Sequence, residues 1–283
     1  MKNSVLNLSS SLSLTVLLLT YNEEANIERT LAGLQWVSCI LAVDSGSTDR
    51  TLEMLAATPT VTIRNRPFDS FAEQCNFGLD LIKTDWVLSL DADYIVTQAL
   101  AEEISAFLQT PNPQHFTGFE IPFLYCIAGK PLRGTLLPPR ICLYRTVGAR
   151  YRNDGHGHRI VVSGKIGRFR HAILHDDRKP LERWLASQQR YLTLETLKLQ
   201  ATPCKQLSMA DRLRLKTPFA PLAALVLCLI VKGGILDGWQ GWTYAFQRCY
   251  AEILLKLMLL ETRARHRVPD SKATDLLLGL RSL

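Results

Sequence analysis

Short apolar runs alternate with amphipathic segments along the first third of the chain. Four apolar runs have the length and composition of buried strands: residues 14–20, 39–43, 61–64 and 86–90. Segments with helical spacing lie between them: residues 25–34, a stretch that ends near residue 57, and residues 70–82. Strands that alternate with helices in this way predict βαβ units. We therefore expect an α/β domain with a mostly parallel central sheet.

Weaker strand patterns continue this domain to residue 178. Residues 119–125 and 141–144 have the composition of strands, and a loop rich in glycine and proline separates them. They indicate the second half of the same domain. We expect residues 1–13 to be an N-terminal tail and residues 14–178 to form the α/β domain.

The remaining residues, 179–283, have a helical and more apolar pattern. Residues 180–199 are amphipathic, and residues 238–260 predict another helix with aromatic residues near its start. Between them, residues 218–231 contain no charged side chain. This run is shorter than the ~20 residues that cross a bilayer, so an interfacial or re-entrant helix fits it better than a span. A buried core helix is the open alternative.

Charge changes this picture mainly in the C-terminal part. The net charge is +7, and residues 201–283 carry 12 Lys and Arg against 6 Asp and Glu. Three of these cations, Arg212, Arg214 and Lys216, precede the apolar run, which favours an anionic membrane surface as partner. No zinc finger or basic repeat with interleaved aromatic residues indicates nucleic acid. The seven cysteines lack a Cys-x-x-Cys spacing, which favours a reducing cytosol over a disulfide framework.

Two carboxylates, Asp91 and Asp93, follow the apolar run 86–90 directly. Side chains two residues apart on an extended chain point the same way, and open α/β sheets place their ligands at the carboxyl ends of the strands. Two convergent carboxylates suit a hard divalent cation that is completed by water and phosphate oxygens. The alternative is a solvated turn after a strand.

Polar segments also follow the first two apolar runs. The first is Thr-Tyr-Asn-Glu-Glu at residues 20–24, where Asn22 is a candidate cap for the next helix. The second is Asp-Ser-Gly-Ser-Thr-Asp at residues 44–49, where Ser47 or Thr48 could cap the helix that follows. No Gly-x-Gly-x-x-Gly or Walker motif follows any strand, which argues against a dinucleotide fold or a P-loop.

Taken in order, residues 20–24, 44–49 and 91–93 resemble the successive motifs of family 2 glycosyltransferases, enzymes with the GT-A fold. The resemblance covers residues 14–108. It implies that four residues hold the nucleoside of a nucleotide sugar: Thr20, Tyr21, Glu23 and Asp44. It also implies that Asp91 and Asp93 hold a metal ion, Mg²⁺ or Mn²⁺, together with the diphosphate, and this agrees with the chemistry of carboxylates.

The same resemblance places a catalytic base in the glycine-spaced cluster at residues 153–159. Asp154 is the first candidate and His156 the second, although the segment departs from the commoner Glu-Asp form of the base motif. His156 and His158 are also possible metal ligands or simply polar loop residues. GT-A enzymes often supply a late histidine as a metal ligand, and His175 matches that position. The alternative there is a helix N-terminus, capped by Asp176 or Asp177.

The expected function is therefore transfer of a sugar to a lipid-linked or lipopolysaccharide glycan of the cell envelope, with inversion and with a metal. Residues 232–238 and the helix that follows are similar to bacterial lipopolysaccharide core glycosyltransferases. We expect a peripheral or partly embedded protein at the cytoplasmic face of the inner membrane, of open oligomeric state. The alternatives are a nucleotidyltransferase of similar layout and a non-catalytic membrane-associated scaffold.

Overall fold

The computed structural model describes residues 13–110, 115–154 and 157–267. Its α/β part is built on a seven-stranded mixed sheet with the strand order β12-β6-β9-β4-β1-β2-β3. These strands are β1 (Leu14–Thr20), β2 (Ile40–Asp44), β3 (Val61–Asn65), β4 (Trp86–Asp91), β6 (Gly118–Ile121), β9 (Arg140–Arg145) and β12 (Ile166–Arg168). The four strands predicted from the first third of the chain are all present.

The parallel half of the sheet places the polar strand ends side by side. Strand β1 lies between β2 and β4 and is parallel to both. Its register pairs Thr20 with Asp44 and Leu19 with Asp91. The carboxyl ends of three strands therefore meet at one edge of the sheet, where open α/β sheets bind their ligands.

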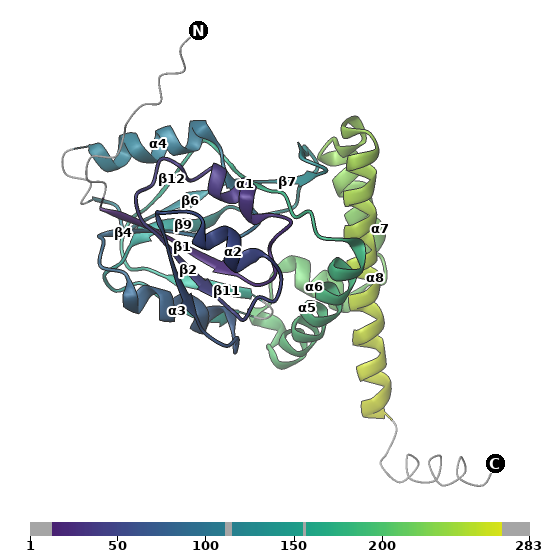
Figure 1. Cartoon of the computed structure of the whole chain (residues 1–283). Coiled ribbons are helices and arrows are strands. Elements are labelled where there is room, and N and C mark those ends of the chain that lie inside the picture. The colour runs from purple at the N-terminus through teal and green to yellow at the C-terminus, as the bar shows by residue number, and fades with distance from the viewer. Residues whose placement is uncertain (1–12, 111–114, 155–156, 268–283) are drawn as a thin grey trace.

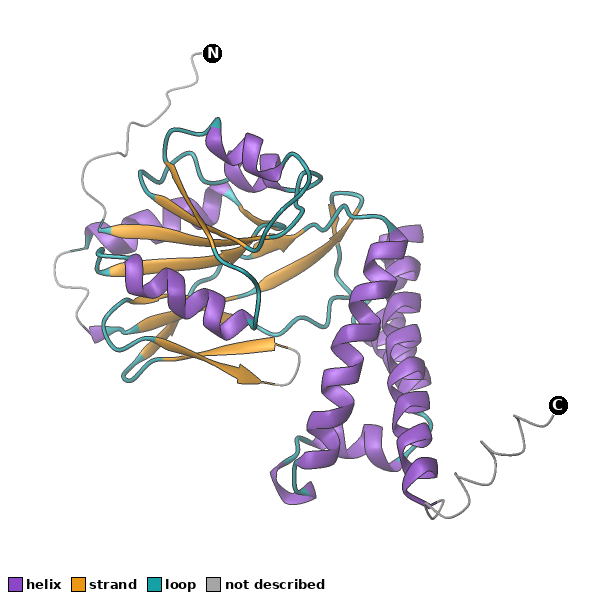
Figure 2. Cartoon of the chain, turned by 60° about the horizontal axis from the view of Figure 1, so that its bottom comes forward, coloured by secondary structure: helices purple, strands orange, loops and turns teal. Residues whose placement is uncertain are grey.

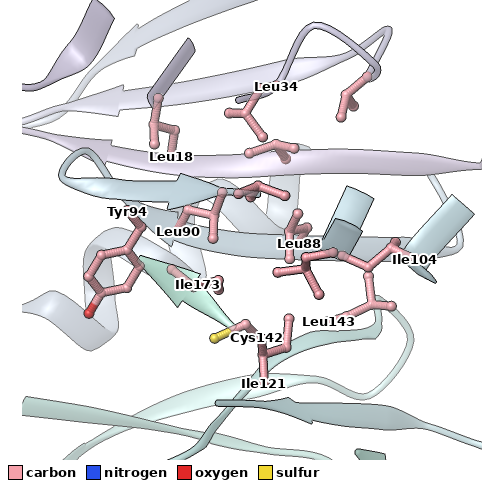
Figure 3. Packing of buried hydrophobic residues seen from close by; sticks show 14 of the residues in the cluster. Leu18, Leu34, Leu88, Leu90, Tyr94, Ile104, Ile121, Cys142, Leu143 and Ile173 are labelled. Carbon is pink, nitrogen blue, oxygen red and sulfur yellow. The ribbon is translucent and has the colours of Figure 1, made fainter. Parts of the chain in front are cut away.

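Apolar side chains on both faces of β1 bury this half of the sheet. Val16 and Leu18 belong to one core cluster and Leu17 to another on the opposite face, and none of the three is exposed. Figure 3 shows Leu18 packed near Leu88 and Leu90 of β4. Burial on both faces explains why these strands have continuous apolar runs rather than an alternating pattern.

Four helices connect the strands of this part: α1 (Ile27–Ala32), α2 (Thr51–Ala56), α3 (Phe71–Leu81) and α4 (Gln98–Gln109). The predicted caps of the first two are wrong. Helix α1 begins after Asn26 and α2 after Arg50. Asn22 has a φ of 52° and its side-chain oxygen accepts a hydrogen bond from the Thr48 amide at 2.7 Å. It therefore ties two loops together instead of capping a helix.

A proline divides the strand predicted at residues 119–125. Strand β6 ends at Ile121, and β7 (Phe123–Ile127) joins a second, four-stranded sheet with the order β5-β13-β7-β8. Pro122 has no N–H to give to a ladder, so the chain changes sheets there. The other members are β5 (Tyr94–Val96), β8 (Lys130–Pro131) and β13 (Ile173–His175), while β10 (Arg150–Asp154) and β11 (Gly157–Val161) form a separate hairpin.

The C-terminal part is helical and lies on one side of the sheets (Figure 2). Its elements are α5 (Leu181–Ala201), the short turn η2 (Cys204–Gln206), α6 (Met209–Lys216), α7 (Ala220–Val226), the π-helical turn η3 (Leu227–Val231), η4 (Gly234–Asp237) and α8 (Trp239–Arg267). Among the residues that are described, no helix has both the length and the apolar character needed to cross a bilayer.

The predicted apolar run is neither wholly buried nor wholly exposed. Cys228 and Leu229 pack with Leu132 and Tyr244 in a small core that joins the helices to the β7–β8 hairpin. The carboxylate of the buried Asp237 accepts a hydrogen bond from the Arg133 amide at 2.7 Å, which adds a polar link between the two parts. The opposite side of the run faces outward, with Ile230 69% exposed.

Candidate active site

Asp44 holds the loop after β2 in place. Its buried carboxylate accepts hydrogen bonds from the amides of Gly46 (2.9 Å) and Ser47 (2.7 Å) and from the hydroxyls of Thr20 (2.8 Å) and Ser47 (2.6 Å). These four donors occupy both carboxylate oxygens. Two of the predicted nucleoside-binding residues, Thr20 and Asp44, are therefore brought together, and their present contacts shape the loop that borders the site.

Tyr21 lies at the border between the sheet and the helical part. Its ring is about half exposed, and the guanidinium of Arg183 in α5 lies 5.7 Å from its centre. Arg183 also donates a hydrogen bond to the Tyr21 carbonyl at 3.3 Å. The first turn of α5 is thus fixed against the loop that follows β1, and Tyr21 keeps an accessible ring.

Glu23 points inward and forms an ion pair with Lys179. The side-chain amide of Asn26 donates a second hydrogen bond to Glu23 at 2.8 Å. Burial, and next the negative charge of Asp93, raise the pKa of Glu23 to about 7, although Lys179 opposes this. The charges of Glu23, Lys179 and Asp93 therefore influence one another. Lys179 is not among the site residues that the sequence predicts.

Asp93 and His175 meet, although 82 residues separate them in the chain. His175 Nε2 lies 3.1 Å from Asp93 Oδ2, because β13 pairs with β5 so that His175 faces Tyr94. Burial disfavours both ionised forms, yet their mutual attraction lowers the pKa of Asp93 and raises that of His175. The rings of Tyr94 and Tyr125 pack against the imidazole.

Asp91 ends β4 and faces groups from several elements. Burial raises the pKa of Tyr191 on α5, and the charge of Asp91 raises it further. At His175 on β13 burial lowers the pKa, and Asp91 opposes this together with Asp93. The pKa of the Arg140 guanidinium on β9 is raised by Tyr94 and, to a smaller extent, by Asp91, although burial opposes this. Neither Tyr191 nor Arg140 was singled out from the sequence, since only the tertiary arrangement places them beside the carboxylates.

The described residues fit a metal ion that is shared with a ligand. They assemble no group of three potential protein ligands. However, Asp93 Oδ1 is buried and has no hydrogen-bond partner, and Asp91 ends the adjoining strand. Mg²⁺ in phosphoryl sites typically takes only one or two carboxylates and completes its shell with water and phosphate oxygens. Asp91 and Asp93 suit this role, with His175 supporting the second carboxylate.

The predicted base lies in the β10–β11 hairpin. Asp154 is the last residue of β10, and the backbone register pairs it with Gly157. The side chain of Asp154 and the whole of His156 lie outside the described residues. The assignment of the base therefore stays a prediction.

His158 packs among aromatic rings in the same hairpin. Its imidazole stacks on Phe71 at 5.6 Å and contacts Tyr151 at 5.1 Å. Burial lowers the pKa of His158, although the charge of Asp91 opposes this. Asn76 of α3 fixes the hairpin by accepting from the Tyr151 amide and donating to its carbonyl. Ring packing therefore holds His158 in place within the hairpin.

The segment after His175 is locked onto helix α1. The buried carboxylate of Asp176 accepts from Arg29 (2.7 Å), from Arg178 (2.8 Å) and from the Gly129 amide (3.2 Å). Neither predicted aspartate caps α5, whose N-cap residue is Pro180. Because this lock follows His175 directly, it also fixes the position of the imidazole.

Asp176→Asn is expected to lower the free energy of unfolding by about 2 kcal/mol, because two half-exposed arginines would lose a buried anionic partner. Urea denaturation measures this. Asp80→Asn is the matched control, since both members of the Asp80–Arg150 pair are more than half exposed and such pairs contribute about 0–1 kcal/mol. Equal losses in the two variants would contradict the proposed lock.

Part of this chain is similar to known proteins. A protein-family model described as "Glycosyl transferase family 2" matches residues 15–126. An uncharacterised glycosyltransferase of Rickettsia typhi is 27% identical over 131 residues, which are 46% of this chain and 44% of the relative. The lipopolysaccharide core biosynthesis glycosyltransferase LpsC of Rhizobium meliloti is 30% identical over 102 residues, 34% of this chain and 37% of the relative.

The chain thus spans less than half the length of these curated relatives. Among solved structures, the TarS fragment 1–349 of S. aureus in complex with UDP-GlcNAc superposes with a TM-score of 0.49 at 13% identity, over 89% of this chain and 91% of that fragment. The resemblance to family 2 glycosyltransferases that the three motifs predict is confirmed for residues 15–126, which the family model matches. Residues 15–126 of this chain are therefore similar to family 2 glycosyltransferases.

Proposed function

We propose that this chain transfers one sugar from a nucleotide-sugar donor to a glycan acceptor. The observation that carries this proposal is the position of Asp91 and Asp93. They lie within the part of the chain that is similar to family 2 glycosyltransferases, at the edge of the sheet where open α/β folds bind ligands. Asp93 Oδ1 is buried and has no hydrogen-bond partner, so this oxygen is available as a ligand for a cation.

The proposed donor site has two parts. The loops after β1 and β2, which contain Tyr21 and are fixed by Asp44, would receive the nucleoside. Asp91 and Asp93 would hold Mg²⁺ or Mn²⁺ against the diphosphate. The ion would offset the negative charge that develops on the departing diphosphate. Lys179 lies close enough to Asp93 to act on its pKa and adds a positive charge at the same place.

The proposed displacement inverts the sugar, because the acceptor hydroxyl attacks the anomeric carbon from the side opposite the diphosphate. A base removes the hydroxyl proton during this attack. The hairpin that carries Asp154 and His156 is the proposed source of that base. Only one side chain is then required for proton transfer.

For the acceptor we propose a lipid-linked or lipopolysaccharide glycan at the cytoplasmic face of the inner membrane. Two features support it: the match to a relative named for lipopolysaccharide core biosynthesis, and the apolar helical part that adjoins the donor site.

A donor screen tests the proposed reaction. The purified protein would be incubated with Mn²⁺ and a panel of nucleotide sugars, and both nucleoside diphosphate and pyrophosphate release would be measured. Selective release of a nucleoside diphosphate from one donor supports the proposal. Release of pyrophosphate would instead indicate a nucleotidyltransferase. Failure to bind any nucleotide sugar, measured by calorimetry, would leave the scaffold alternative.

A further inference from the structure

A continuous set of apolar side chains is exposed on helices α7 and α8 and on the turns between them. On α8 the exposed positions recur every three or four residues: Trp239, Trp242, Phe246, Tyr250, Ile253 and Leu257. This spacing keeps them on one side of the helix over about 30 Å. On the preceding elements, Ile230, Leu236 and their neighbours are also exposed. We call the exposed apolar side chains of residues 219–260 the apolar face.

The apolar face is not an unfinished core. The other side of α8 is already buried, with Tyr244, Leu255 and Leu259 packed in two separate clusters. The start of α8 packs closely on η4, since a β-carbon on Gly241 would lie 1.9 Å from the Gly234 carbonyl oxygen. Figure 1 shows α7 and α8 side by side at the margin of the molecule. The helices are therefore held with these side chains outward.

The charges around the apolar face indicate what covers it. Between residues 217 and 260, all of which are described, Lys232 is the only exposed charged residue, and no carboxylate is exposed there. Lys216 is exposed just before this stretch. A second copy of the chain would oppose cations with cations and would bring no exposed carboxylate of its own face. Anionic lipid headgroups supply the missing negative charge.

The exposed tryptophan and tyrosine side chains of the apolar face also favour a membrane as its partner. Tryptophan and tyrosine prefer the headgroup level of a bilayer, where an apolar ring and a polar edge are both satisfied. The described helices do not cross a bilayer, and an interfacial helix needs only one apolar side. We propose that the apolar face inserts into the headgroup region of a membrane and places the helical part flat on its surface.

This proposal differs from an electrostatic anchor built on the basic residues before the run. Arg214 forms an ion pair with Glu252 at 2.6 Å and another with Asp211 at 3.0 Å. Arg212 donates hydrogen bonds to the carbonyls of Leu207 and Lys205. Because Asp211 and Glu252 neutralise the charge of Arg214 within the protein, we expect apolar insertion to supply most of the free energy of membrane binding.

The full-length chain is tested with vesicles of phosphatidylcholine, with and without phosphatidylglycerol, by co-sedimentation. The double variant Ile230→Gln/Leu236→Gln is expected to bind at least about tenfold more weakly, because two exposed apolar side chains are lost. The matched control Leu81→Gln/Val147→Gln changes two exposed apolar residues of the α/β part. It should bind like the wild type. Circular dichroism verifies that both variants are folded.

Two further measurements decide whether a membrane or a second copy of the chain covers the apolar face. Trp239 and Trp242 should shift the fluorescence emission to the blue when vesicles are added, and most binding should survive 0.5 M salt, since screening weakens only the electrostatic share. The proposal is overturned if the test variant binds vesicles as well as its control does. It is also overturned if salt releases the protein completely, or if sedimentation equilibrium without lipid shows a dimer that only the test variant dissociates. None of these measurements needs turnover, so the result is independent of the proposed reaction.

Discussion

Asp93→Asn is expected to reduce sugar transfer by on the order of 100-fold or more. An amide keeps the shape of the side chain but removes the negative charge that a divalent cation requires. It also ends the attraction that raises the pKa of His175, so the imidazole loses its charged partner. Two parts of the site would fail together. The measurement is the initial rate of nucleoside diphosphate release at saturating donor and Mn²⁺.

Asp85→Asn is the matched control for this substitution. Asp85 is exposed and lies immediately before β4, at the end of that strand opposite to Asp91. Its replacement should leave the rate unchanged. Calorimetry of nucleoside diphosphate binding with Mn²⁺ should show weaker binding only for the Asp93 variant, and a chelator should weaken binding to the wild type. Undiminished turnover of Asp93→Asn, or full turnover in chelator, would show that the acidic pair does not work through a metal.

The parallel half of the sheet could be predicted from the sequence because its signal is local. Each strand is a short continuous apolar run, and each is followed by a polar segment. Parallel neighbours then bring these segments to one edge, as the pairing of Thr20 with Asp44 confirms. No long-range information is needed for that step.

The other half of the site depends on contacts that no local pattern encodes. His175 was proposed from the family resemblance, and its contact with Asp93 follows only from the pairing of β13 with β5. Lys179 stands in a polar segment that reads equally well as a helix start. Tyr191 reads as one apolar position of an amphipathic helix. Their electrostatic interactions with the carboxylates arise from the way α5 and the residues just before it dock beside the sheet.

The C-terminal part shows the same limit. From the sequence alone, the basic residues before the apolar run favour an anionic membrane surface as their partner. Glu252 lies 38 residues further along the chain than Arg214, yet α8 brings it within 2.6 Å. The sequence of α8 has apolar residues on several sides, and only the packing of the helix decides which of them are buried and which form the apolar face.

Asp154→Asn is expected to lower the rate of sugar transfer by about 100- to 10,000-fold, the usual contribution of a general base. Donor affinity should change little, because a base acts on the acceptor hydroxyl. The backbone supports this position: Asp154 ends β10, and the same hairpin places His158 close enough to Asp91 for the carboxylate to influence its pKa. The hairpin therefore lies within electrostatic range of Asp91. The measurement is a comparison of kcat with the calorimetric affinity for the donor.

His156→Ala separates the two candidates for the base. If it lowers kcat at unchanged donor affinity while Asp154→Asn does not, the role belongs to His156, and the pH profile should then follow an imidazole rather than a carboxylate. Asn153→Ala is the matched control, since Asn153 lies one residue earlier on β10 with an exposed side chain that cannot accept a proton near neutral pH. A loss of kcat in the control equal to that in Asp154→Asn would mean that the hairpin acts through its shape. In that case proton transfer would have to be assigned to a group outside residues 153–159.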